Sequence, residues 1–480
     1  MRISKATALL GLCAFAGATA YAGRAAAEDC STRRPTDPSG FAGYSYGASE
    51  VKSYATAHIR VWYTLDGTNA VRPQSARADL VPDDVAVAGD TTEAAYAKYL
   101  EMGFRAPLGD GGHPACVTNG GDDKIDVYLL RFQSADGQTV HEQCKPGTVS
   151  TCPTFIMAEA RLDQRYASYA EGVRTVLVHE LFHSVQSAYN AEMDGFWLEG
   201  SAQWAAKTVS PEIGDLERLL PDFFKEVGRS IDSPPGGAAV GFLYGAAVWP
   251  VFLDEHFGKD AVRTMMEELG SRKATAMAAA ELVLPKLGSS TGDAFPLFLA
   301  WNAATGSRAG SGGFKNAAKY PKLAIGELPE GDKVDDLTAG FSYHMYHTQA
   351  SKATEYLLDT DPARNRGILL PLTGGVADVA RAKALPATLE GEGIVIVTGV
   401  SAKKSDAAFT LRWQAPGASS SSSSSSGASG SGDGSSGGCS AAGPERKGAS
   451  GAFGIFAAVA VCVLAACRRK RATTERLPRA

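Results

Sequence analysis

The feature that most constrains this chain is a pair of histidines four residues apart in VLVHELFHSVQSAYN, residues 176–190. Apolar residues recur there at helical spacing, so the sequence predicts a helix from about Ser168 to Asn190. On such a helix, His179 and His183 stand one turn apart on the same face. Their imidazole nitrogens can therefore reach a single zinc ion at about 2 Å.

Two glutamates complete this pattern. Glu180 is rotated away from the line of the two histidines, where it can contact a water beside the metal. HExxH is the signature of zinc peptidases, with the Glu as general base. Glu199 follows sixteen residues after His183, in FWLEGSAQWAA (196–206), and supplies a third ligand from the next predicted helix. Three protein ligands and an open fourth position are typical of a catalytic zinc site.

The order of these motifs resembles the gluzincins, in which HExxH is followed by a Glu on a second helix. The metzincin pattern fails, because position 186 is Gln and position 189 is Tyr. HELFHSVQ and WLEGSAQW also resemble the paired motifs of a family of myxobacterial metalloproteases, over roughly residues 55–310 and more weakly beyond. The resemblance implies a zincin-like catalytic domain that hydrolyses peptide bonds.

Residues outside the motif are candidates for supporting roles. Tyr244, in LYGAAVWPVFLDEHFG, is predicted to stabilise the oxyanion, because in gluzincins a downstream Tyr followed by Gly-Ala often does so. A core or capping tyrosine is the alternative, and Tyr189 is a weaker candidate for the same role. Gln186 lies on the histidine face and either orients a ligand, touches substrate or is a surface polar residue.

One position departs from the gluzincin pattern. Some gluzincins place an Asp four residues after the ligand Glu, where it holds a histidine, but this chain has Gln203 there. Hydrogen-bond partners of this kind tune the basicity of a metal ligand. The departure predicts either a weaker site or another supporting carboxylate, Glu192 or Asp194.

Four cysteines lie between the two ends of the chain: Cys30, Cys116, Cys144 and Cys152. In an exported protein an even number predicts two disulfides, with three possible connectivities. We favour Cys144–Cys152 together with Cys30–Cys116. His113 and His141 flank cysteines and are predicted to be solvated loop residues.

Both ends of the chain carry targeting signals. Residues 1–27 have basic residues, an apolar run and a small-residue cleavage site, which predict a secretory signal peptide. Residues 415–442 form a Ser/Gly-rich linker containing Cys439, and residues 449–471 predict a transmembrane span with a basic stop. This tail resembles the MYXO-CTERM sorting signal, which implies a membrane stage, sorting machinery acting at Cys439, and display at the cell surface or outer membrane.

The remaining pattern predicts an α+β fold. An irregular segment is predicted over 28–54, and strand-like runs then lead into the helix that carries HExxH. Helical patterns fill 198–305. Together these elements predict a metalloprotease domain over 55–310. Short apolar runs at regular spacing predict a small β-sandwich over 320–414. The predicted strand TFIMAEA lies just before the helix that carries HExxH. We predict that it forms the edge of the sheet, to which an extended substrate adds as a further strand.

Net charge is −5 with no basic block outside the tail, so no nucleic-acid partner is expected. The sequence predicts a secreted or surface-displayed zinc metallopeptidase acting on proteins or peptides. Because no GAMEN segment is present, an endopeptidase is favoured over an aminopeptidase. The alternative is a catalytically silent, zinc-containing surface adhesion or binding protein. Glu180 counts against it, because a structural zinc site needs no general base.

Overall fold

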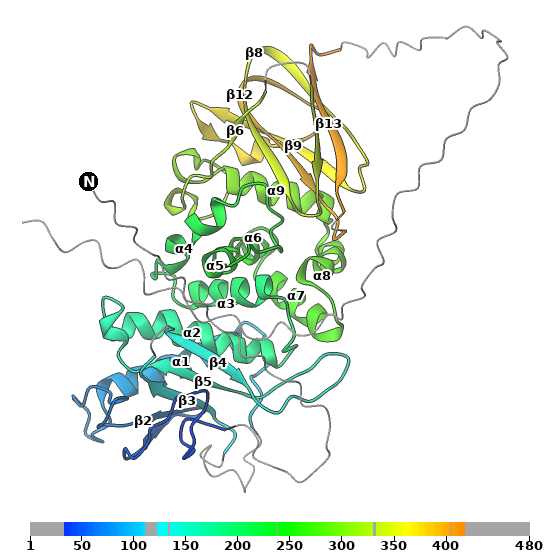
Figure 1. The fold of residues 1–480 in the computed structure, drawn as a ribbon. Coiled ribbons are helices and arrows are strands. Elements are labelled where there is room, and N and C mark those ends of the chain that lie inside the picture. The colour runs from blue at the N-terminus through cyan, green and yellow to red at the C-terminus, as the bar shows by residue number, and fades with distance from the viewer. Residues whose placement is uncertain are drawn as a thin grey trace, which may run out of the picture.

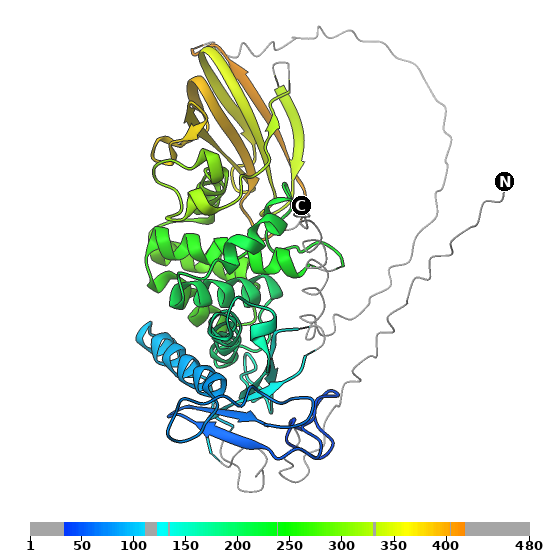
Figure 2. The same ribbon diagram turned by 90° about the vertical axis from the view of Figure 1, so that its left-hand side faces the viewer.

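The structure is a computed structural model that describes residues 33–110, 122–132, 135–237, 239–329, 333–403 and 405–417. The predicted signal peptide, membrane span, Cys439 and Cys30–Cys116 pair lie outside these residues. In the part of the chain that the structure describes, no helix is both long and apolar enough to cross a membrane. The fold has three layers, with one sheet at each end and helices stacked between them (Figures 1 and 2).

The first sheet has five strands in the order β1-β2-β3-β5-β4. Their bounds are Lys52–Ala55 (β1), Ile59–Tyr63 (β2), Ile125–Leu130 (β3), Gly137–His141 (β4) and Thr154–Glu159 (β5). The three central strands are parallel, whereas β1 and β4 are antiparallel to their neighbours. The prediction that TFIMAEA forms the edge is therefore wrong, because β4 covers that side of β5. β4 has the sequence GQTVH, which carries little strand signal.

The two faces of this sheet are covered differently. Helices α1 (Asp83–Glu101) and α2 (Tyr169–Ser187) pack on one face. The segment 33–50 covers the other face, where Tyr46 packs with Tyr128 and Phe155. The Tyr46 hydroxyl oxygen lies 2.8 Å from the carbonyl oxygen of Trp62 and 3.0 Å from that of Leu129, so its proton is shared between these two acceptors. This segment has almost no regular structure, as predicted, but it is an integral part of the core.

Helices fill the middle layer, as the pattern over 198–305 predicts. They are α3 (Gly195–Val209), α4 (Asp215–Phe224), α5 (Val240–Gly245), α6 (Val248–Phe257), α7 (Asp260–Ser271), α8 (Ala276–Val283) and α9 (Thr291–Ala303). Their buried faces join those of α1 and α2 in one continuous apolar core. Glycines allow the closest approaches: a Cβ on Gly245 of α5 would lie 2.6 Å from Phe223 Cβ of α4.

The remaining strands form one sheet in the order β10-β9-β12-β8-β13-β7, antiparallel along this path. The bounds are Gly326–Glu327 (β6), Lys333–Thr338 (β7), Tyr343–Thr360 (β8), Asn365–Thr373 (β9), Val376–Ala377 (β10), Lys383–Ala384 (β11), Ala387–Gly399 (β12) and Ala407–Gln414 (β13). The predicted sandwich of two sheets is therefore corrected to a single sheet. Two of the runs behind that prediction, FSYHMYHTQ (341–349) and TEYLLDT (354–360), fall in one 18-residue strand, β8. The α+β class is confirmed.

This second sheet is not an independent module. Ile394 and Ile396 on one of its faces belong to the same core as the helices, and α9 contacts β9 and β12. The loop between α4 and α5 is also tied to it, because Ser230 Oγ donates to the carbonyl oxygen of Gly340 at 2.7 Å. The sheet thus supports the loop that leads into α5, the helix that carries Tyr244.

Candidate metal centre

Two capped helices position the predicted ligands. The Ser168 hydroxyl caps α2 by accepting from the backbone N–H of Glu171, and an Asp194 carboxylate oxygen caps α3 by accepting from that of Trp197. Such side chains satisfy N–H groups that have no partner within the helix. α2 packs against β4 and β5 on one side and against α3 on the other. The motif face of α2 therefore meets Glu199 of α3.

The three predicted ligands converge on one point. His179 Nε2 lies 3.0 Å from His183 Nε2 and 3.2 Å from Glu199 Oε2, and His183 Nε2 lies 3.6 Å from the same oxygen. Tetrahedral ligands about 2.0–2.1 Å from a zinc ion would be separated by about 3.3–3.4 Å. The donor set therefore fits zinc in both chemistry and spacing. In the described ranges this is the one group of three or more such side chains that could hold a metal ion.

Charges within the cluster favour a protonated histidine while no metal is bound. Burial opposes the imidazolium form of His183, but the neighbouring Glu199 carboxylate outweighs it and raises the pKa of His183 to about 9. Burial also opposes ionisation of Glu199, yet the two histidines, His183 foremost, hold its pKa well below the ordinary value. In the metal-free protein, a proton on His183 therefore takes the place of a cation.

Zinc affinity should consequently fall as the pH falls. Below about pH 9 the His183 imidazole must lose its proton before Nε2 can serve as a ligand, so the dissociation constant should rise about tenfold per pH unit. Chelator competition from roughly pH 6 to 8 measures this slope, and calorimetry in buffers of different ionisation enthalpy counts the released protons. An affinity that does not change over this range would contradict the assignment of His183 as a ligand.

Gln186 orients the second histidine. His183 Nδ1 donates to Gln186 Oε1 at 2.6 Å, which leaves Nε2 free to face the cluster. The amide nitrogen of Gln186 donates to the carbonyl oxygen of Leu198, at 2.8 Å, and to Ser201 Oγ, at 2.9 Å. Gln186 is fully buried. Of the three predicted possibilities, its contacts match orientation of a ligand, and they also tie α2 to the residue before Glu199.

Replacing Gln186 by Met should therefore weaken zinc binding about 10–100-fold, because Met fills the space but cannot accept from His183. Chelator competition measures the dissociation constant, and circular dichroism checks that the variant is folded. Gln203→Met is a matched control, since Gln203 is also buried but donates to Asp215 Oδ2, at 3.0 Å. Equal affinities in the two variants would refute the orienting role.

The first histidine has no such partner. His179 Nδ1 is buried without a hydrogen-bond partner among the described residues. The predicted supporting carboxylates do not reach it: Glu192 bonds to Ser150 on the surface, and Asp194 caps α3 and accepts from Ala276 N. The prediction of another supporting carboxylate is thus wrong for both residues, because each carboxylate is engaged by other partners.

Glu180 is held by the edge strand. Thr139 Oγ1 on β4 lies 2.8 Å from Glu180 Oε2, to which it can donate, and 2.8 Å from the Glu180 carbonyl oxygen. A Cβ on Gly137 would lie 2.6 Å from Val176 Cγ1 and 2.9 Å from Glu180 Cγ. Glycine at position 137 therefore allows β4 to approach α2 closely enough for Thr139 to reach the carboxylate.

Of the two tyrosines proposed to stabilise the oxyanion, only one lies at the ligand cluster. The ring of Tyr244 stacks on the ring of His179, with centroids 5.0 Å apart and planes within 4°. Burial and the carboxylates of Glu199 and Glu180 raise the pKa of Tyr244, so its hydroxyl stays protonated and can donate. Tyr189 instead accepts from Arg105 N, at 2.9 Å, away from the cluster. Only Tyr244 is placed to serve the predicted site.

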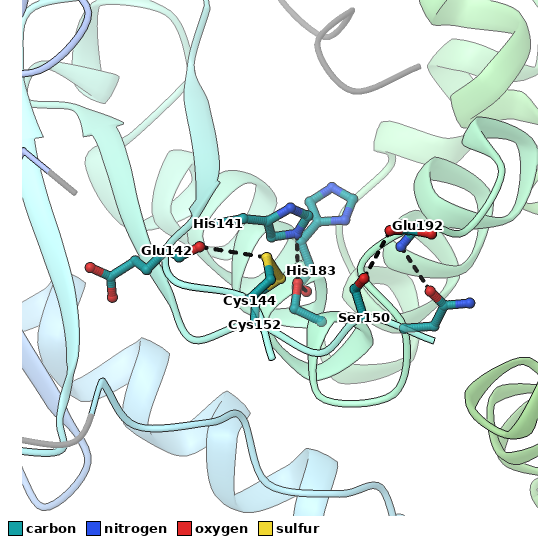
Figure 3. The surroundings of a disulfide bond; sticks show 9 residues. His141, Glu142, Cys144, Ser150, Cys152, His183 and Glu192 are labelled. Atoms are coloured by element: carbon teal, nitrogen blue, oxygen red, sulfur yellow. Dashed lines mark hydrogen bonds between the residues drawn. A yellow bond between two sulfur atoms is a disulfide. The ribbon is translucent and has the colours of Figure 1, made fainter. Parts of the chain in front are cut away.

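A further histidine lies beside the cluster (Figure 3). His141, predicted to be a solvated loop residue, is the last residue of β4, and its Nε2 lies 2.8 Å from Ser187 Oγ of α2. The predicted Cys144–Cys152 disulfide is confirmed three residues further on. The backbone N–H of Cys152 donates to the carbonyl oxygen of Ser187 at 3.1 Å. Nothing in the sequence indicated that Thr139 and His141 would approach the motif helix.

Comparison with known proteins adds no family. No protein-family model matches the chain, and no curated protein sequence matches it significantly.

Proposed function

We propose that this protein is a zinc metallopeptidase with a zincin-like catalytic domain and a gluzincin-like ligand set. The observation that carries the proposal is the convergence of His179 Nε2, His183 Nε2 and Glu199 Oε2 within 3.6 Å, beside the carboxylate of Glu180. A structural zinc site would need the ligands but not the glutamate. The targeting signals of the sequence support an exported protein displayed at the cell surface.

The chemistry follows from the residues around the cluster. His179, His183 and Glu199 would hold the zinc ion, which would polarise a carbonyl group and lower the pKa of water toward about 7. Glu180 takes the proton from the attacking water and delivers it to the leaving amine. Thr139 holds this carboxylate in place. Tyr244 donates to the oxygen on which negative charge develops.

The open edge of β4 gives the site a means of binding peptides. Asp136 O accepts from Glu159 N, and Glu142 N donates to Pro153 O, both at 2.9 Å. Pairing alternates along an antiparallel strand, so the N–H and C=O groups of residues 137, 139 and 141 point away from β5. Among the described strands none lies beyond β4. An extended peptide can therefore add to this edge beside Glu180.

Zinc content and peptide cleavage test the proposal together. Elemental analysis of the purified protein should give about one zinc per chain, and His183→Ala should retain little. The zinc-loaded parent should then cleave internal bonds in a peptide library. A folded parent that takes up no zinc after reconstitution would overturn the proposal. A parent with zinc but no cleavage would favour the adhesion protein.

A further inference from the structure

We propose that His141 is a substrate-binding residue of this site, which holds an extended peptide on β4 by accepting a hydrogen bond from one of its N–H groups. This inference rests on the proposed function, because it needs a peptide at the edge of β4. It adds a side chain that the motif does not contain. The argument depends on where the ring lies, how rigidly it is held and which nitrogen carries the proton.

The ring of His141 lies beside the metal cluster. Gly137 and Thr139 of β4 face Glu180 of α2. His141, two residues after Thr139, faces Ser187 of the same helix. These three residues share one face of the strand, the face toward α2. Figure 3 shows the rings of His141 and His183 next to each other. A peptide alongside β4 at Glu180 therefore passes the ring of His141.

Two contacts hold His141 in this position. Its Nε2 is bound to Ser187 Oγ, and the backbone carbonyl of Ser187 accepts from Cys152, whose disulfide to Cys144 closes the loop that follows β4. In addition, Ala191 N donates to the carbonyl oxygen of Ser150 at 2.8 Å. The end of β4 and the loop that follows it are thus fastened to the end of α2. A side chain fixed in this way loses little entropy when it binds a ligand.

The same contacts decide which nitrogen is free. Ser187 Oγ donates to the carbonyl oxygen of His183 at 2.9 Å, which uses its one hydroxyl proton. Ser187 Oγ must then accept from His141, so Nε2 of His141 carries the proton and Nδ1 is an acceptor. Among the described residues no hydrogen bond is recorded for Nδ1 of His141, and its ring lies next to that of His183 (Figure 3). An acceptor there suits a peptide N–H.

The test combines side-chain removal with removal of the N–H group. In zinc-loaded Glu180→Gln, which should bind but not cleave, we compare the affinity of a peptide cleaved by the parent with and without His141→Ala. The same peptide is then made with single ester bonds in place of the N–H groups near the scissile bond. Gln138→Ala serves as a matched control, because its side chain is on the opposite face of β4.

We expect His141→Ala to weaken peptide binding about fivefold to tenfold, the usual effect of one hydrogen bond, with zinc content unchanged. One ester position should weaken binding by a similar factor in the protein with His141 and by none in the protein without it. Equal affinities with and without His141, or an ester effect that persists in His141→Ala, would overturn the inference. If the parent cleaves no peptide at all, the proposed function fails, and this inference fails with it.

Discussion

Replacing Glu180 by Gln should lower kcat by about 10²–10⁴-fold and leave one zinc per chain, because Gln fills the same space but cannot take a proton from water. Of the charged residues of HExxH and Glu199, Glu180 is the one that is not part of the ligand cluster. Its Oε2 lies 2.8 Å from Thr139 Oγ1 of β4. Its removal therefore separates chemistry from metal binding. Stopped assays with a fluorogenic peptide measure kcat, and elemental analysis measures zinc.

Two further variants sharpen this result. Glu192→Gln removes an exposed carboxylate from the loop after α2 and should leave kcat unchanged. Thr139→Val keeps the shape of the side chain but releases the Glu180 carboxylate, so a smaller loss of kcat is expected. If Glu180→Gln retained activity, the general-base mechanism would be wrong. If it lost zinc, Glu180 would belong to the ligand set.

The convergence of the proposed metal ligands could be predicted because helical geometry places residues i and i+4 on one face, whatever the rest of the fold does. The prediction for His179 and His183 therefore depended only on residues 169–187 being helical. The prediction for Glu199 depended only on a second helix following. The strand that holds Glu180 could not be predicted in the same way. β4 has five residues, and its side chains become informative only when tertiary packing brings Thr139 onto α2.

The same reason explains the error about the second sheet. Short apolar runs indicate strands, but they do not show whether two runs belong to one strand or to two sheets. In β8 the runs around Met345 and Leu358 are joined through Gln349–Ser351, which are polar or small but still extended. The regular spacing of such runs therefore predicts a sandwich, although two of the runs form a single long strand.

Arg34 is buried on the face of the first sheet opposite α1 and α2, and a second large effect is expected from its replacement. Arg34 is 3% exposed and contacts the carboxylates of three residues, Asp110, Asp126 and Glu142. It belongs to the segment 33–50, which covers this face without regular structure. Burial raises the pKa of Asp126 to about 7 against the opposing charge of Arg34, with smaller contributions from the other two carboxylates.

Replacing Arg34 by Met should destabilise the protein by about 3–5 kcal/mol, because three buried carboxylates would lose the cation that compensates them. Urea unfolding followed by tryptophan fluorescence measures the loss. Arg33→Met, an exposed neighbour, is the matched control and should change stability by less than about 0.5 kcal/mol. A loss in Arg34→Met no larger than that of the control would show that the carboxylates do not need the arginine.

The pH dependence of this cluster follows from the sign of the Asp126 shift. Its pKa is higher in the folded protein, about 7, than the ordinary value of 3.8, so the folded state holds the proton more tightly. The contribution of Asp126 to stability is therefore full below about pH 4 and is lost as the pH rises through about 7. Without Arg34 this loss should be larger, and Asp126→Asn should recover part of it in Arg34→Met. Glu142 is the first residue after β4 and directly follows His141. Loss of its ion pair with Arg34 would therefore also loosen the edge of β4 at which the peptide is proposed to bind.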